Sequence, residues 1–313
     1  MAMASVRRRG AGPMTRRHLP PAALLSSVLL LWTVGGRCRS FAAGAAAVAA
    51  PARSPRAGSR LARPALHGAA AILPTVYVYD HCPFCVRARM IFGLKGIRHS
   101  IIWMPNDDMQ LPTSLVGKKI APILEMPGEA PMAESLDIIK RIDEDPEWGA
   151  PLLQPASGRE DLKAWSKRVS GTMRLLVRPR YPRGFFPEFT WLRSREAFVR
   201  NHPVADPETG DIPEKAKWLE LGPKVWNAWY DAHLANTEVL LKELNTAMED
   251  LEGLIDSEES VSPGGVGYDD VTFWDRLRGA TIIKGLKLGP KAKAYTEKMS
   301  EKTDIPLLTG IAI

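Results

Sequence analysis

A pair of cysteines falls where a short strand gives way to a helix. Residues 76–79 read VYVY, a β-branched and aromatic run typical of a strand, and a helical pattern follows over residues 83–95. A second strand is expected over residues 99–104, which completes a parallel strand-helix-strand unit. Cys82 and Cys85 therefore stand three residues apart at the start of a helix, on one face and within reach of a disulfide.

Three uses of this pair compete at the level of sequence. A structural zinc site needs four ligands, whereas only two thiols remain if Cys38 leaves with an N-terminal leader, and His81 and His99 lack the usual spacing of a second ligand pair. The non-catalytic alternative is a pair of unreactive core cysteines or a structural disulfide. The position inside a strand-helix-strand unit favours thiol–disulfide exchange, the setting in which this motif is most often redox-active.

The start of the helix predicts which sulfur reacts. Cys82 lies at or just before the helix cap, and Pro83 takes the first helical position, where its missing N–H costs nothing. The Cys82 sulfur would face the free N–H groups of Phe84 and Cys85 and the positive end of the helix dipole. The dipole contributes only ~0.3–1 kcal/mol, so we expect N–H···S hydrogen bonds to supply most of the lowering of the Cys82 pKa.

The next elements extend the unit into a thioredoxin-like layout. Residues 105–116 are polar and helical at most, and residues 120–126 form a strand interrupted by Pro122. A turn leads to a short partner strand near Met132, and a helix is expected over residues 134–143. The order βαβ followed by ββα predicts an α/β thioredoxin-like domain.

Beyond a Pro-, Gly- and Trp-rich linker, the periodicity is only helical. Ser157 and Glu160 form a capping-box pattern before a helix that Pro179 stops. Further helices are expected over the three ranges 224–255, 270–288 and 291–303, the second of which has Gly267 at its cap. The segment 181–223, dense in Pro, Trp and Phe, carries no pattern that assigns it.

Two short features beside the cysteines fit a bound thiol peptide. If the Ala121–Pro122 bond is cis, the Ala121 backbone would turn toward Cys82 and offer its N–H and C=O to an extended ligand; a trans edge proline is the alternative. Glu134 and Ser135 open the next helix, where the Ser135 hydroxyl and helix N–H groups could hold a carboxylate while Glu134 takes an ammonium. An ordinary helix cap is the alternative there.

The basic charge of the chain belongs to its first 72 residues. They contain eleven Arg and neither Lys, Asp nor Glu, so the net charge of +7 becomes −4 for residues 73–313, and no nucleic-acid partner is expected. Arginines precede the apolar run 22–34, which has the layout of a secretory signal and is short for a membrane span. Cys38 and Ser40 suit a cleavage site, and the following tract has the composition of a transit peptide.

Such a leader resembles the bipartite leaders of algae with complex plastids. We therefore expect a plastid location reached through the secretory pathway. An uncleaved signal anchor, or a single long mitochondrial or plastid presequence, is the alternative reading of the same residues.

Four stretches of the body closely resemble the glutaredoxin 2 family, the larger glutaredoxins built like glutathione transferases. They are YVYDHCPFCVRARMIFGLKGI, NDDMQLPTSLVGKKIAPILEM, AESLDIIKRIDE and the terminal IPLLTGIAI, and the resemblance covers residues 75–313. It implies a thioredoxin-like domain followed by an all-α glutathione-transferase-like domain, with glutathione as reductant. Two departures are Phe84, where the family commonly has Tyr, and an enlarged stretch around residues 202–222.

The resemblance also implies roles for individual residues. Cys82 would be the nucleophile and Cys85 the resolving thiol, and Pro83 and Phe84 between them would belong to the glutathione-binding residues. Around the bound glutathione, Ala121 and cis-Pro122 would lie beside its cysteine, and Glu134 with Ser135 at its γ-glutamyl end. No metal is implied.

The expected function is thus glutathione-dependent reduction of mixed disulfides and protein disulfides. The alternatives are an omega-like glutathione transferase or dehydroascorbate reductase, because a CPF-containing site occurs there too, and a non-enzymatic scaffold of the same fold. The expected partners are glutathione and glutathionylated or disulfide-bonded proteins, in a monomer without stable membrane insertion. The expected domains are a signal peptide (1–40), a transit-peptide-like leader (41–73), the thioredoxin-like glutaredoxin domain (74–146), a linker (147–158) and the all-helical domain (159–313).

Overall fold

A mixed four-stranded sheet forms the base of the structure, a computed structural model that describes residues 73–313. Its strands lie in the order β2-β1-β3-β4, with β1 parallel to β2 and antiparallel to β3, and β3 antiparallel to β4. Their bounds are Thr75–Val78 (β1), Ser100–Trp103 (β2), Ile123–Glu125 (β3) and Met132–Ala133 (β4). The expected leader, apart from Leu73, lies outside the described residues.

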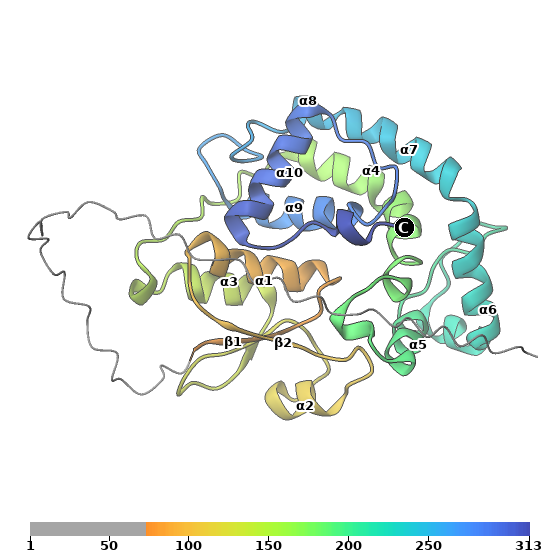
Figure 1. Ribbon diagram of the computed structural model, residues 1–313, viewed down its shortest axis with the longest axis horizontal. Coiled ribbons are helices and arrows are strands. Elements are labelled where there is room, and N and C mark those ends of the chain that lie inside the picture. The colour runs from red at the N-terminus through yellow and green to blue at the C-terminus, as the bar shows by residue number, and fades with distance from the viewer. Residues whose placement is uncertain (1–72) are drawn as a thin grey trace, which may run out of the picture. The chain divides into compact units, whose positions relative to one another are not determined.

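Helices cover both faces of this sheet. Helix α1 (Pro83–Leu94) and helix α3 (Ser135–Asp143) pack against each other on one face, and α2 (Gln110–Val116) lies on the other side (Figure 1). The strand-helix-strand unit and the ββα unit that the sequence predicts are therefore confirmed. Helix α3 shows why they form, since its buried residues Ile138, Ile139 and Ile142 fall on one side of the helix.

The second part of the chain is entirely helical, as expected. Above α1 in Figure 1 lie α4, α9 and α10, with α7 beyond them and α5 and α6 to one side. The helices are α4 (Glu160–Val177), α5 (Leu192–Asn201), α6 (Lys215–Ala235), α7 (Thr237–Glu249), α8 (Leu251–Leu254), α9 (Tyr268–Ala280) and α10 (Pro290–Thr303). Short 3₁₀ turns complete the part, namely η1 (Pro146–Trp148), η2 (Tyr181–Arg183), η3 (Pro187–Phe189) and η4 (Leu308–Ile311).

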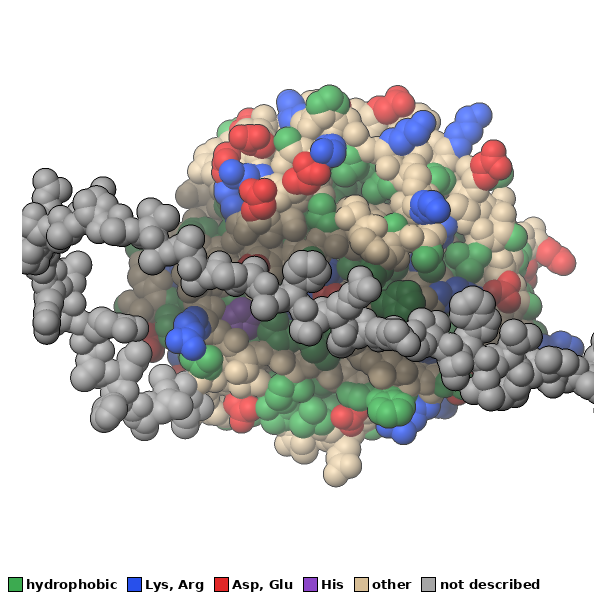
Figure 2. All heavy atoms as spheres, viewed as in Figure 1, with side chains coloured by type: hydrophobic (Ala, Val, Ile, Leu, Met, Phe, Trp, Pro, Cys, Tyr) green, Lys and Arg blue, Asp and Glu red, His purple; other side chains and the backbone are tan. Residues whose placement is uncertain are grey.

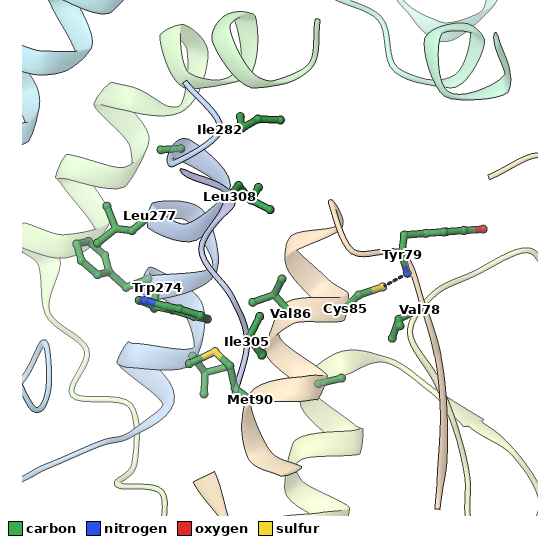
Figure 3. Packing of buried hydrophobic residues seen from close by; sticks show 14 of the residues in the cluster. Val78, Tyr79, Cys85, Val86, Met90, Trp274, Leu277, Ile282, Ile305 and Leu308 are labelled. Atoms are coloured by element: carbon green, nitrogen blue, oxygen red, sulfur yellow. Dashed lines mark hydrogen bonds between the residues drawn. The ribbon is translucent and has the colours of Figure 1, made fainter. Parts of the chain in front are cut away.

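Helix α1 is buried on two sides. Val86 and Met90 point toward Trp274 of α9 and Ile305 after α10, whereas Cys85 points the other way, toward β1 (Figure 3). All five of these side chains are buried, and each large apolar one stabilises the fold by roughly 1.5–3 kcal/mol. The expected double burial of this helix is confirmed, and α9 and α10 supply its second cover.

A partly buried cluster of charged side chains joins the two parts beside this apolar contact. Asp80, in the turn before α1, accepts hydrogen bonds from Arg89 (2.6 Å) and from Arg278 of α9 (2.8 Å). Arg278 also donates to the Asp80 carbonyl oxygen at 2.7 Å. One α9 side chain therefore fixes the turn that carries the cysteines.

Three expectations for the helical part are wrong in detail. The helix expected over 224–255 is divided at Asn236 and Asp250 into α6, α7 and α8. The helix expected to reach residue 288 ends at Ala280. Turns follow it and lead to Gly285, which has a φ of 89°. In both cases apolar residues continue at helical spacing beyond the break.

The third wrong expectation is the capping box at Ser157. Helix α4 is capped at Arg159, and the Ser157 hydroxyl bonds to the Asp269 carboxylate of α9 instead. The expected cap at Gly267 is confirmed, since its N–H donates to the Asp270 carboxylate at 2.8 Å.

The surface of the described part mixes both signs of charge. Figure 2 shows acidic and basic side chains interspersed over the helical layer on the face drawn, and hydrophobic ones gathered along the lower edge. Among residues 73–313, no helix is both long and apolar enough to cross a membrane.

Gly93 of α1 provides a test of how closely the two parts fit. A Cβ at this position would lie 1.9 Å from the carbonyl oxygen of Thr303 at the end of α10. Gly93→Ala must therefore move backbone, and we expect a loss of about 3 kcal/mol of stability and a Tm lower by roughly 5–10 °C. Thermal unfolding followed by circular dichroism measures this change.

Gly171→Ala is the matched control, because a Cβ at this position of α4 would meet no atom within 4 Å. Its Tm should equal or slightly exceed that of the parent chain, since Ala favours a helix by up to about 1 kcal/mol over Gly. An unchanged Tm for Gly93→Ala would show that α1 and α10 are not in backbone contact.

Candidate functional site

The start of α1 places the two cysteines in different surroundings. Cys82 is the N-cap residue, with φ −78° and ψ 121°, and Pro83 is the first helical residue, as expected. Cys82 is partly exposed and Cys85 is fully buried, and both sulfurs are free thiols. The Cys85 sulfur accepts a hydrogen bond from the Tyr79 N–H of the chain after β1 at 3.3 Å (Figure 3).

This difference separates the acidities of the two thiols. The pKa of Cys82 is lowered to about 7, chiefly by a hydrogen bond from the Cys85 thiol, against the opposing effect of burial. Positive charge on His81 and the N–H groups of Cys85 and Phe84 lower it further. Burial raises the pKa of Cys85 well above its usual value, so Cys82 is the sulfur available as a thiolate near neutral pH.

The lowered pKa of Cys82 was expected, and the expected N–H groups of Cys85 and Phe84 contribute to it. The Cys85 thiol is a further cause that the sequence analysis did not name, and it is the largest single one. The CxxC spacing therefore acts twice in this structure. It keeps a second thiol within reach, and it supplies the hydrogen bond that favours the thiolate of the first.

A cavity of about 380 Å³ opens beside Cys82. Residues 81–84 line one side of it, and α4 and α9 line the other, with Met173 and Val177 among its apolar residues. Phe84 is half-exposed, and the guanidinium of Arg87 lies 5.0 Å from the centre of its ring. A larger hollow of about 830 Å³ lies farther along α4 and α9, and Leu136 of α3 is among the residues that line it.

The other predicted binding residues lie on the α/β side, outside the lining of the smaller cavity. The Ala121–Pro122 peptide bond is cis and immediately precedes β3. Ser135 is buried at the first position of α3, and Glu134 is its N-cap residue. Glu134 has a φ of 74°, in a region where a residue other than glycine is uncommon and often marks a functional site.

Glu134 also has a partner that the sequence did not reveal. The Lys118 ammonium lies 3.2 Å from its carboxylate, and both side chains are largely exposed. An exposed pair of this kind contributes only ~0–1 kcal/mol, so an ammonium group of a ligand can replace Lys118 at little cost. The Glu134 carboxylate is therefore still available to the ammonium group of a ligand, as the sequence analysis expected.

Several residues of the unassigned segment 181–223 contact the site and were missed by the sequence analysis, Glu188 and Tyr181 among them. Glu188 of η3 accepts hydrogen bonds from the His81 ring and backbone, and Tyr181 of η2 lies against the same ring. Glu188 and His81 are 107 residues apart in sequence. A single Glu in a Pro- and Phe-rich segment carries no periodicity, so nothing in the sequence marks it.

The described part of the chain contains no cluster of side chains that could bind a metal ion. Within residues 73–313, no three His, Cys, Asp or Glu side chains gather closely enough to hold a metal ion. The arrangement described here is instead a pair of thiols of unequal acidity beside a cavity between two layers.

Comparisons with known proteins agree with this geometry. Residues 76–151 match the model of the glutathione S-transferase N-terminal domain, and residues 223–312 match that of the glutaredoxin 2 C-terminal domain. Glutaredoxin 2 of Escherichia coli K12 is 31% identical over 240 residues, which are 76% of this chain and 99% of that protein.

A solved structure shows the same likeness. Glutaredoxin 2 of Salmonella typhimurium, in complex with glutathione, is 32% identical with a TM-score of 0.65, over 77% of this chain and 99% of that one. Identity at this level over nearly the whole length of the relatives, together with the matching C-terminal domain, shows that the chain belongs to the glutaredoxin 2 family.

Proposed function

We propose that this chain is a glutathione-dependent oxidoreductase that reduces glutathione mixed disulfides and protein disulfides through Cys82 and Cys85. The observation that carries the proposal is the unequal acidity of two neighbouring thiols, one partly exposed and one buried. A thiol attacks fastest when its pKa lies near the ambient pH, and Cys82 meets this condition at neutral pH. The glutathione bound in the Salmonella relative supports glutathione as the reductant.

The reaction follows from this assignment. The Cys82 thiolate attacks the glutathione sulfur of a mixed disulfide, the S–S bond breaks, and the substrate sulfur leaves with the electron pair and takes up a proton. A second glutathione then attacks the glutathione sulfur on Cys82, which releases the Cys82 thiolate and forms glutathione disulfide. With a protein disulfide, the Cys82 thiolate attacks one of the two sulfurs, the protein S–S bond breaks, and a mixed disulfide between Cys82 and the protein forms. Cys85, after losing its proton, then attacks the Cys82 sulfur, and the protein thiolate leaves and takes up a proton. Two glutathione molecules afterwards reduce the Cys82–Cys85 disulfide and leave as glutathione disulfide.

The α/β side of the site offers groups for glutathione itself. In this proposal Ala121 and cis-Pro122 flank the glutathione cysteine, next to Pro83 and Phe84 on α1. The γ-glutamyl carboxylate meets the Ser135 hydroxyl and the N–H groups at the start of α3, and its ammonium replaces Lys118 at Glu134. The cavity on the opposite side remains open to the substrate that carries the disulfide.

Cysteine replacements test the roles of the two sulfurs. Cys82→Ser should abolish reduction of a glutathione mixed disulfide, because no thiolate remains at the exposed position. Cys85→Ser should retain that activity and lose reduction of protein disulfides, because the resolving thiol is absent. The measurement is NADPH consumption coupled through glutathione reductase, and equal activity of Cys82→Ser and the parent chain would refute the assignment.

A second pair of variants tests the cause of the Cys82 acidity. The rate of alkylation of Cys82 by iodoacetamide should rise with pH around a midpoint near 7 in the parent chain. Cys85→Ala removes the donor that stabilises the thiolate, so the midpoint should move to higher pH. Cys85→Ser keeps a donor and should stay closer to the parent value; identical midpoints for Ala and Ser would contradict this cause.

We also propose that residues 1–72 direct the protein to a plastid through the secretory pathway. The basis is the sequence order of arginines, an apolar run and an acid-free tract. A fluorescent protein fused after residue 72 should accumulate in plastids of an alga with complex plastids. Retention in the secretory pathway, or import into mitochondria, would contradict the proposal.

A further inference from the structure

Glu188 and His81, the residue before Cys82, form a buried pair. The Nδ1 atom of His81 lies 2.6 Å from Oε1 of Glu188, and the backbone N–H of His81 donates to the same oxygen at 2.9 Å. The side chains are 7% and 0% exposed. Two bonds to one carboxylate oxygen therefore fix both the backbone and the ring of the residue that precedes the nucleophile.

Aromatic rings enclose this pair. The ring centres of Phe189 and Phe198 each lie 4.9 Å from that of His81, and that of Tyr181 lies at 5.2 Å. Charges interact more strongly in such surroundings than in water. The second carboxylate oxygen, Oε2, has no hydrogen-bond partner among residues 73–313, so the pair is the main compensation for the Glu188 charge.

We propose that Glu188 is a positioning residue whose buried carboxylate fixes the ring and the backbone of His81 next to Cys82, so that the Glu188–His81 pair makes Cys82 rather than Cys85 the reactive sulfur. The proposal rests on the function proposed above. It gives the helical part of the chain, which contains Glu188, a role in the reactivity of Cys82. Glu188 touches neither sulfur. It acts through His81, whose ring lines the same cavity as Cys82.

The two charges of the pair act in opposite directions on the two thiols. The positive charge of His81 lowers the pKa of Cys82, whereas the negative charge of Glu188 raises the pKa of Cys85. The Glu188–His81 pair therefore increases the difference between the pKa values of the two thiols. A lone histidine or a lone glutamate would not produce both effects.

The other titratable and charged groups near His81 and its cavity come from four elements and from the chain after β1. Burial raises the pKa values of Tyr79 and Tyr181 and lowers that of His202 to about 3, so these three stay neutral at working pH. The pKa of Asp275 is raised to about 6 by burial. The remaining groups that line the cavity are guanidinium groups that keep their charge, namely Arg174, Arg178 and Arg276.

The test is the pH dependence of Cys82 alkylation in Glu188→Gln, measured with iodoacetamide on the reduced full chain and located by mass spectrometry. Gln keeps an oxygen acceptor for His81 and removes the negative charge. We expect the midpoint to move upward by about one pH unit, because without the carboxylate the positive charge of His81 is no longer held beside Cys82, where it stabilises the thiolate. A purely structural role for Glu188 would leave the midpoint where it is.

Two further variants complete the cycle. His81→Asn should shift the midpoint upward to a similar extent, and the double variant should shift it no further than either single one, because both act through the same charge. Repeating the comparison in an Asp275→Asn background removes the titration of that carboxyl from the profile. Glu196→Gln, which neutralises an exposed carboxylate of α5, is the matched control and should leave the midpoint unchanged.

The midpoints of Cys82 alkylation in these variants decide whether the Glu188–His81 pair controls the acidity of Cys82. An unchanged or lowered midpoint in folded Glu188→Gln overturns the proposal, and so does an additive double variant. If circular dichroism shows that Glu188→Gln fails to fold, an unchanged midpoint in His81→Asn overturns it alone. Because alkylation needs no glutathione, the result stands apart from disulfide-reduction assays, which test the proposed function separately.

Discussion

The burial of α1 on two sides is the constraint on which the rest of the structure depends. One side of this helix carries Cys85 against the sheet, and the other carries Val86 and Met90 against α9 and the chain after α10. Because α1 belongs to both cores, the two parts of the chain cannot separate without exposing it. The turn before α1, where Asp80 meets Arg278, is thereby fixed relative to α9, and the cysteines inherit that rigidity.

The local fold could be predicted where short-range patterns decide it. Strand β1, helix α1 and helix α10 follow from β-branched residues, from Pro83 at the first helical position and from helical spacing. The end of α9 could not, because Ile282 and Ile283 are buried beyond it and continue the apolar pattern of the helix. Likewise the apolar spacing runs through the breaks that separate α6, α7 and α8.

The site divides in the same way. Cys82 and Cys85 are marked by their position between a strand and a helix, whereas the unequal exposure of the two sulfurs depends on how α1 packs in the structure. Lys118, Arg278 and Glu188 could not be foreseen, because each reaches the site through tertiary packing. The buried carboxylate of Glu188 even lies in a segment whose sequence assigns no element.

The contact between Glu188 and His81 also bears on how such chains can diversify. The motif and its flanking helix fit within the first α/β layer, so recombination could in principle carry them to another protein as a cassette. The partner of His81, however, is encoded 107 residues downstream in the helical half. A transplanted layer would keep both sulfurs and lose the counter-charge, so inheritance of this redox centre is tied to the chain as a whole.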